Sequence, residues 1–244
     1  MDQSTALHIS LAKGRSESDL FPSVSSRIAF LRRVLRDGVD VNTTVNPYHL
    51  AAKGVIPIIV STNSKDEIAS IVRLKEELGG IPRFVILGGA EAHLVARSLA
   101  RSQIPVIVTP ARCKPSSWNS LACLTGSPLS NGTGFHILHE AGVEIGIGLF
   151  DPGSARDLAW DAGWVSATGA AHTIDEKQAI GFVTWNLEKI FGLDNHLQKK
   201  RSGLKVGLEA EFVVYSGSPL DMKSRVVAVV GGGRELPRIF PKAV

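Results

Sequence analysis

The chain has 244 residues, of which 44% are hydrophobic and 20% are charged, a composition typical of a globular protein with one large domain or two modest ones. Its net charge is +4, but lysine and arginine are scattered, and no basic stripe with interleaved aromatic residues predicts nucleic-acid binding. We expect neither a membrane-spanning segment nor a signal peptide, and therefore a cytoplasmic protein.

The N-terminal part shows little periodicity. Residues 1–23 are polar and unpatterned, and we expect them to be disordered or a remnant. A helix is predicted over 25–36, where apolar residues recur on one face. Residues 37–53 carry turn signals and are interpreted as a connector.

From residue 54 onward, short apolar runs alternate with helical patterns. Ser64 and Glu67 have the spacing of a capping box at the start of the first of these helices. Strands are predicted at 55–60, 84–87, 104–108 and 143–149, and helices at 64–78, 90–101, 134–141, 154–168 and 175–191. This alternation predicts a parallel sheet covered by helices, with functional residues at the C-terminal ends of the strands.

Two further segments interrupt this pattern. Residues 110–130 form an irregular insert that contains Cys113 and Cys123, whose ten-residue spacing fits neither a zinc motif nor a disulfide framework. We therefore expect either the thiols of a protein in a reducing compartment or simply buried thiols. Residues 203–232 contain two predicted strands, 210–215 and 225–230, with no helix between them, which indicates a small β appendage.

The appendage and the helix before it resemble a known family. Residues 184–193, T-W-N-L-E-K-I-F-G-L, resemble the T-x-N-x-A-x-x-L-G-L helix near the end of amidohydrolase-superfamily barrels. Residues 207–220 resemble the strand by which those proteins return to their small β-sandwich. Residues 88–96 are similar to the turn and helix after the sixth strand of imidazolonepropionase-like members.

The resemblance implies an α/β fold with a partial (β/α)8 TIM-type barrel. Residues 24–202 would supply the fifth to eighth strands, and residues 203–244 would be a remnant of the β-sandwich and a tail. The first four strands have no expected counterpart before Val55, and the family's His-x-His pair occurs nowhere in the sequence. We therefore expect self-association, or a partner chain that supplies the N-terminal half of the barrel.

The resemblance also implies a hydrolase that acts on carbon–nitrogen bonds other than peptide bonds in a small-molecule substrate, with a divalent metal such as zinc. Asp151, at the end of the eighth strand, matches the family's metal-binding and catalytic acid, although an N-terminal helix cap is the alternative. Glu91, His93 and His172 are candidate substrate-binding residues. Glu91 could instead be a helix-start carboxylate and His93 a buried helical histidine.

Most of the metal ligands of such a family are missing. Residues 61–63, Ser-Thr-Asn, and residues 88–89, Gly-Gly, stand where metal-binding histidines are usual. Weaker alternatives are an anion cradle at residues 87–90 and a metal site at His136 and His139, which are three residues apart on one helix. Three interpretations stay open: an amidohydrolase with a degraded metal site, a catalytically inactive pseudoenzyme or binding subunit, and a sugar-deacetylase-like hydrolase.

Overall fold

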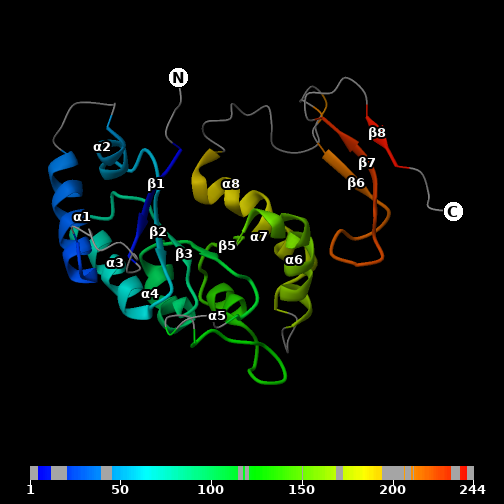
Figure 1. Cartoon of the computed structure of the whole chain (residues 1–244), viewed down its shortest axis with the longest axis horizontal. Helices are drawn as coiled ribbons and strands as arrows, with labels where there is room; N and C mark the ends of the chain where they lie inside the picture. Colours follow the sequence, from blue (N-terminus) through cyan, green and yellow to red (C-terminus); the bar gives the residue numbers. More distant parts are fainter. Residues whose placement is uncertain are drawn as a thin grey trace.

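The computed structural model describes residues 5–11, 21–39, 46–114, 118, 121–149, 151–168, 173–193, 206, 210, 212–231 and 237–240. These residues form two sheets, one parallel with five strands and one antiparallel with three. Figure 1 shows the antiparallel sheet as a separate unit beyond α6 and α7. None of the helices in the described ranges combines the length and the apolar character that a membrane crossing requires.

The parallel sheet has its strands in the order in which they occur along the chain. They are β1 (Leu7–Ser10), β2 (Ile58–Thr62), β3 (Phe84–Gly88), β4 (Val106–Val108) and β5 (Ile145–Ile147). The last four overlap the predicted apolar runs and pair in parallel. The prediction of an α/β fold with a parallel sheet is therefore confirmed, and the C-terminal ends of the strands meet at one edge.

Strand β1 lies in the segment where no regular structure was expected. It pairs in parallel with β2, with Leu7 opposite Ile58 and Ser10 opposite Ser61. Its side chains alternate between half-buried and exposed, the pattern of a strand with one face on the core. The expectation of disorder is wrong here, because two apolar residues in a polar segment are enough to complete an edge strand.

Helices connect and flank the strands. They are α1 (Val24–Val39), α2 (Pro47–Ala52), α3 (Lys65–Glu77), the 3-10 helix η1 (Ala92–Val95), α4 (Ala96–Arg101), α5 (Gly134–Glu140), the 3-10 helix η3 (Pro152–Asp157), α6 (Leu158–Ala167), α7 (Glu176–Val183) and α8 (Trp185–Phe191). Helix α2 replaces part of the predicted connector, because Asn46 accepts a hydrogen bond from Tyr48 N at 2.9 Å and Pro47 occupies the first helical turn.

Two predicted helices differ in detail. The predicted helix over 175–191 is broken at Thr184, whose φ of −131° and ψ of −104° are not helical, so α7 and α8 are separate. Ser64 caps α3 by accepting from Asp66 N, but the predicted capping box is absent from this helix. The Glu67 carboxylate instead accepts a hydrogen bond from the hydroxyl of Thr62, at the end of β2.

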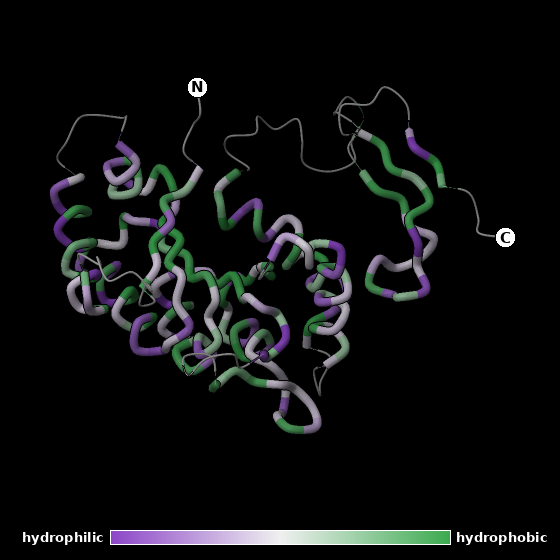
Figure 2. The backbone as a smooth tube through the Cα atoms, viewed as in Figure 1, coloured by the Kyte–Doolittle hydropathy of each residue, from purple (hydrophilic) through white to green (hydrophobic). Residues whose placement is uncertain are grey.

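Each face of the parallel sheet has its own apolar cluster. One face packs alternate strand residues, such as Val60 and Ile86, against the helices. The opposite face is smaller, and there Ile59, Val85 and Ile107 pack with Ile190 of α8. Figure 2 shows the hydrophobic residues concentrated along the strands. Helix α8 thus covers the sheet on the face opposite the main core.

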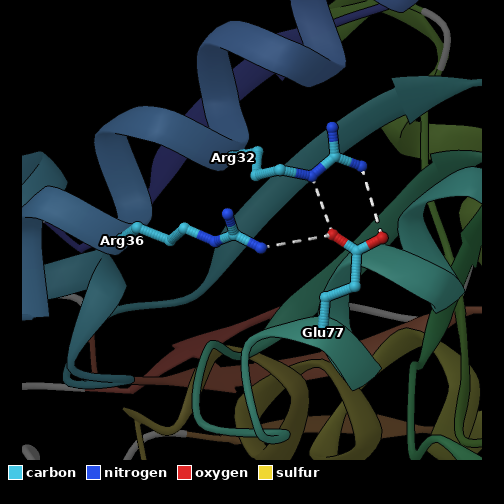
Figure 3. A network of polar contacts seen from close by, with 3 residues as sticks. All are labelled: Arg32, Arg36 and Glu77. Atoms are coloured by element: carbon cyan, nitrogen blue, oxygen red, sulfur yellow. Dashed lines mark hydrogen bonds and ion pairs between the residues drawn. The ribbon is translucent and has the colours of Figure 1, made fainter.

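Polar contacts fix α8 and α1 in place. Asn186 Nδ2 donates to the Ile145 carbonyl at 2.9 Å, which satisfies one acceptor at the free edge of β5. Figure 3 shows the cluster that joins α1 to α3, in which Arg32 Nε lies 2.7 Å from Glu77 Oε2 and Arg36 lies 3.9 Å from the same oxygen. Because these side chains are partly exposed, the cluster orients the helices more than it stabilises them.

The second sheet is antiparallel and contains β6 (Phe212–Tyr215), β7 (Val226–Val230) and β8 (Arg238–Ile239). The first two strands confirm the predicted β appendage, whereas β8 falls in the segment predicted to be a tail. The loop between β6 and β7 contacts the helices: Leu220 packs against the main core, and Ser218 Oγ donates to Glu176 Oε2 at 2.9 Å.

Candidate functional site at the strand ends

A cavity of ≈ 110 Å³ lies at the C-terminal ends of β2, β3 and β4. Its lining includes Asn63, Gly88 and Gly89 from the first two strand ends, and Thr109, Arg112 and Lys114 from the loop after β4. The hydroxyl oxygen of Thr109 is buried and has no hydrogen-bond partner among the described residues. The cavity therefore offers an unpaired buried hydroxyl and the charge of Lys114 to a ligand the size of a few water molecules, whereas Arg112 is paired with Asp161 at 2.9 Å.

Asn63 holds the end of β2 to the glycine turn after β3. Its Oδ1 accepts from Ala90 N at 3.2 Å, and its carbonyl accepts from Glu91 N at 3.0 Å. Gly88 has a φ of +110°, and a Cβ built on it would lie 2.7 Å from Asn63 Oδ1. Only glycine fits this close approach.

The turn is not an anion cradle. Gly89 N donates to the Thr62 carbonyl at 2.8 Å, and the amides of residues 90 and 91 are bound to Asn63. An anion cradle needs free N–H groups at a helix start, and these are already used. The weak cradle hypothesis for residues 87–90 is therefore wrong.

Glu91 and His93 bind the local backbone. Glu91 Oε2 accepts from Lys65 N at 2.9 Å, so this carboxylate binds the start of α3 and makes no capping hydrogen bond to its own helix, where the predicted alternative placed it. His93 is buried, and its Nδ1 lies 3.1 Å from the Ala90 carbonyl, so Nδ1 carries the proton. Burial lowers the pKa of His93, against opposing contributions from the Ala90 hydrogen bond and Glu91. Neither side chain lines the cavity.

Asp151 is exposed and precedes η3. It accepts a hydrogen bond from Ser154 Oγ at 2.7 Å, and this bond is the largest cause of a lowered Asp151 pKa. The positive charge of Lys114, on the cavity rim, adds to the lowering. Asp151 is thus a charged carboxylate in the position of a cap residue, and among the described residues it belongs to no group of three or more His, Cys, Asp or Glu side chains.

His136 and His139 face different partners. His136 Nδ1 accepts from Thr133 N at 3.1 Å, which completes a capping box at the start of α5. Its proton therefore sits on Nε2, which is buried without a partner in the described chain. His139 Nε2 lies 3.3 Å from Gln178 Nε2. The two rings do not share a metal, and His172 lies outside the described residues.

The loop after β4 contains a disulfide between Cys113 and Cys123, with a Cα–Cα distance of 5.4 Å. The expectation of free thiols is wrong, because the loop folds back and brings the two residues together at the cavity. Both cysteines line it. The inference of a reducing compartment, which rested on these residues, therefore loses its basis.

The donor set does not fit the metal that the family resemblance implies. Hydrolytic metals are held by several imidazole and carboxylate groups at one point. Among the described residues, no group of three or more His, Cys, Asp or Glu side chains converges in this way. We therefore derive no metal-dependent step from this part of the chain.

The contacts of Asn63, the unpaired hydroxyl of Thr109 and the disulfide are the features that the sequence does not predict. The sequence gives only weak indications of these features. Thr109 directly follows an apolar run, Asn63 lies three residues after one, and the two cysteines lie in the longest loop. The positions of Glu91, His93 and Asp151 were predicted correctly as lying after strands, but their predicted roles in substrate or metal binding stay predictions.

Comparisons with known proteins give the class of fold. No family model matches the sequence. The chain is 32% identical over 208 residues to the protein named Amidohydrolase tasK from Hapsidospora irregularis, an alignment that covers 76% of this chain and 19% of that protein. The fold matches the crystal structure of an amidohydrolase from Thermotoga maritima MSB8 with a TM-score of 0.70 and 22% identity.

The structural match covers 92% of this chain and 60% of the Thermotoga chain. The chain is therefore similar in sequence to one protein named as an amidohydrolase, and it shares the fold of the Thermotoga amidohydrolase over most of its own length. It spans only 19% of the curated relative and 60% of the solved chain that it matches.

Proposed function

We propose that this chain is an amidohydrolase-like component of a hydrolase and that it does not carry out metal-dependent hydrolysis by itself. The observation that carries the proposal is the donor set at the strand ends. Asn63 and Gly88 stand at positions where the family places histidine ligands. The Asn63 side chain accepts a hydrogen bond from Ala90 N, and Gly88 leaves the space that the Asn63 side chain occupies. Asp151 alone cannot hold a hydrolytic metal or activate water.

The component would be part of a (β/α)8 barrel. Strands β2 to β5 would be its fifth to eighth strands, and β1 would take the fourth place. The unpaired backbone groups at the two outer edges of the described sheet support a place within a larger barrel. Leu7 N and Leu11 N donate toward β2, so the backbone groups of His8 and Ser10 point away from the sheet. At the other edge, the backbone groups of Ile147 have no hydrogen-bond partner among the described residues.

The antiparallel sheet would be a remnant of the small β-sandwich. Val213, Val214 and Tyr215 of β6 are 46%, 40% and 38% exposed, and every residue of β7 is only half-buried. A sheet this apolar normally buries one face against a second sheet. The exposure of β6 therefore supports a sandwich whose other sheet lies outside the described residues.

The missing donors would come from a complementing part, either another polypeptide or a further segment of a longer protein. Together they would hydrolyse carbon–nitrogen bonds other than peptide bonds, such as those of cyclic amides. The similarity of residues 88–96 favours the imidazolonepropionase-like branch. The small volume of the strand-end cavity, ≈ 110 Å³, supports an incomplete pocket, because ligand sites usually exceed about 300 Å³.

A hydrolysis assay tests the proposal. The purified chain, supplied with zinc or manganese, is incubated with lactam, hydantoin and imidazolone substrates, and ring opening is followed by mass spectrometry. We expect no turnover above a metal-only blank. Turnover that disappears on chelation and in the Asp151→Asn variant would refute the proposal, because the chain would then hold a working metal centre.

A further inference from the structure

A second, larger cavity lies at the opposite end of the parallel sheet. It has a volume of ≈ 390 Å³ and is bordered by the segments that enter β3, β4 and β5, together with α3 and α8. Its polar lining consists of Lys75, Arg83, Gln103, Glu144 and Lys189. The strand-end cavity contains none of these residues, so the two are separate sites.

The charges around this larger cavity do not balance. Lys189 forms an ion pair with Glu144. Lys75 and Arg83 have no ion pair with any residue in the described ranges; Lys75 Nζ donates to the Gln103 carbonyl at 3.2 Å, and Arg83 donates to the Ile190 carbonyl at 3.2 Å. Three cations therefore share the lining with one carboxylate, and two of them are bound only to neutral acceptors.

The surroundings partly desolvate both charges and hold them near each other. Lys75 and Arg83 are both half-buried. Burial lowers the pKa of Lys75, and the positive charge of Arg83 lowers it further. Two like charges in a partly desolvated cavity repel each other, and an anion between them would remove this repulsion.

We propose that this cavity binds a small dianion of the phosphate class between Lys75 and Arg83, with Lys189 at its edge. The guanidinium offers two parallel donors to the oxygens of a phosphate, and the ammonium supplies a second point charge. The excess of two cations over the one carboxylate matches the charge of the ligand. The volume admits inorganic phosphate or a phosphate monoester with a small organic group.

Binding here would tie α8 to the sheet. Lys75 comes from α3, Arg83 from the segment before β3, and Lys189 from α8. One anion would therefore connect α3, which packs in the main apolar cluster, with α8 and the segment before β3, which already meet through the Arg83–Ile190 hydrogen bond. The ligand is predicted to stabilise the folded chain, because it binds only when these elements are in place.

Calorimetric titration of the full chain with inorganic phosphate at low ionic strength tests the proposal. We expect saturable binding of one phosphate per chain and a higher unfolding temperature in its presence. Lys75→Gln should weaken binding by about tenfold or more, since it removes one charge-assisted contact. Arg83→Lys should also weaken it, because the charge remains but the paired donors are lost.

Lys65→Gln is the matched control, because Lys65 is an exposed lysine at the other end of the same helix. This variant should bind phosphate as the native chain does.

A parallel titration with glycerol 2-phosphate distinguishes the source of the anion. Binding tighter than that of free phosphate indicates a phosphate monoester as the ligand, and weaker binding indicates the free ion. Absence of saturable binding, or equal affinity in the native chain and Lys75→Gln, would overturn the proposal. So would an equal loss in Lys65→Gln, which would indicate general charge attraction.

Discussion

Gly88 shows how one residue without a side chain decides the chemistry of the strand end. Its position was predicted from the sequence as a turn without a ligand atom. The structure adds the reason for glycine: the backbone has a positive φ, and Asn63 and the Thr62 carbonyl occupy the space of a side chain. A histidine ligand could not be placed here without rebuilding the end of β2.

Gly88→Ala is predicted to destabilise the protein by about 2 kcal/mol or more, because a Cβ would meet Asn63 Oδ1 at 2.7 Å and the Thr62 carbonyl at 2.8 Å. Gly79→Ala is the control. Gly79 also has a positive φ, but nothing lies within 4 Å of its Cβ position, so the cost should be only ~1 kcal/mol. Urea unfolding measures both; equal losses would contradict the close contact.

His136 gives the protein a predicted pH dependence. Burial lowers the pKa of His136 below the ordinary value of 6.5, and burial lowers that of His93 in the same way. The unfolded chain therefore binds protons more readily than the folded chain does. The stability that comes from keeping His136 neutral is complete above pH 6.5 and is lost as the pH falls through the folded-state pKa of His136. The free energy of unfolding should be lower at about pH 5 than at about pH 7.5.

His136→Gln separates this effect from general acid sensitivity. Glutamine at the third helical position can keep the capping box of α5 and does not titrate. The difference in unfolding free energy between the two pH values should shrink in this variant, with the part due to His93 remaining. An unchanged difference would show that His136 does not contribute.

At the scale of elements, the sequence predicts what lies in continuous apolar runs and misses what depends on long-range contacts. Strands β2 to β5 were found because parallel strands are buried on both faces. Strand β1 was missed because Leu7 and Ile9 alone are too few to form a pattern. The break at Thr184 was missed because apolar residues keep helical spacing across it, so periodicity alone predicts one helix.

The disulfide in the loop after β4 could not be predicted either, because spacing alone does not reveal whether the two cysteines meet in space. Replacing both Cys113 and Cys123 by serine should lower stability by about 2–3 kcal/mol, because the link closes a short loop and restricts the unfolded chain. Urea unfolding of the oxidised native chain and the double variant measures this loss. Free thiols in the native chain under non-reducing conditions would contradict the link.

At the scale of the whole molecule, both sheets expose surfaces that normally have partners. The backbone groups of β1 that face away from β2 and the apolar residues of β6 can pair with another chain. The chain alone is therefore predicted to self-associate, with a mean mass that rises with concentration in sedimentation equilibrium. A single monomeric species at all concentrations would contradict the proposed partial barrel.

Among the described residues, the strand ends lack the donors of a hydrolytic metal centre. The sequence predicted this from residues 61–63 and 88–89, and the structure supplies the contacts that occupy Asn63 and Gly88. The most direct measurement is the zinc content of the purified chain after incubation with excess zinc and gel filtration, determined by mass spectrometry. We expect far less than one zinc per chain. One zinc retained per chain, and lost in Asp151→Asn, would contradict this expectation.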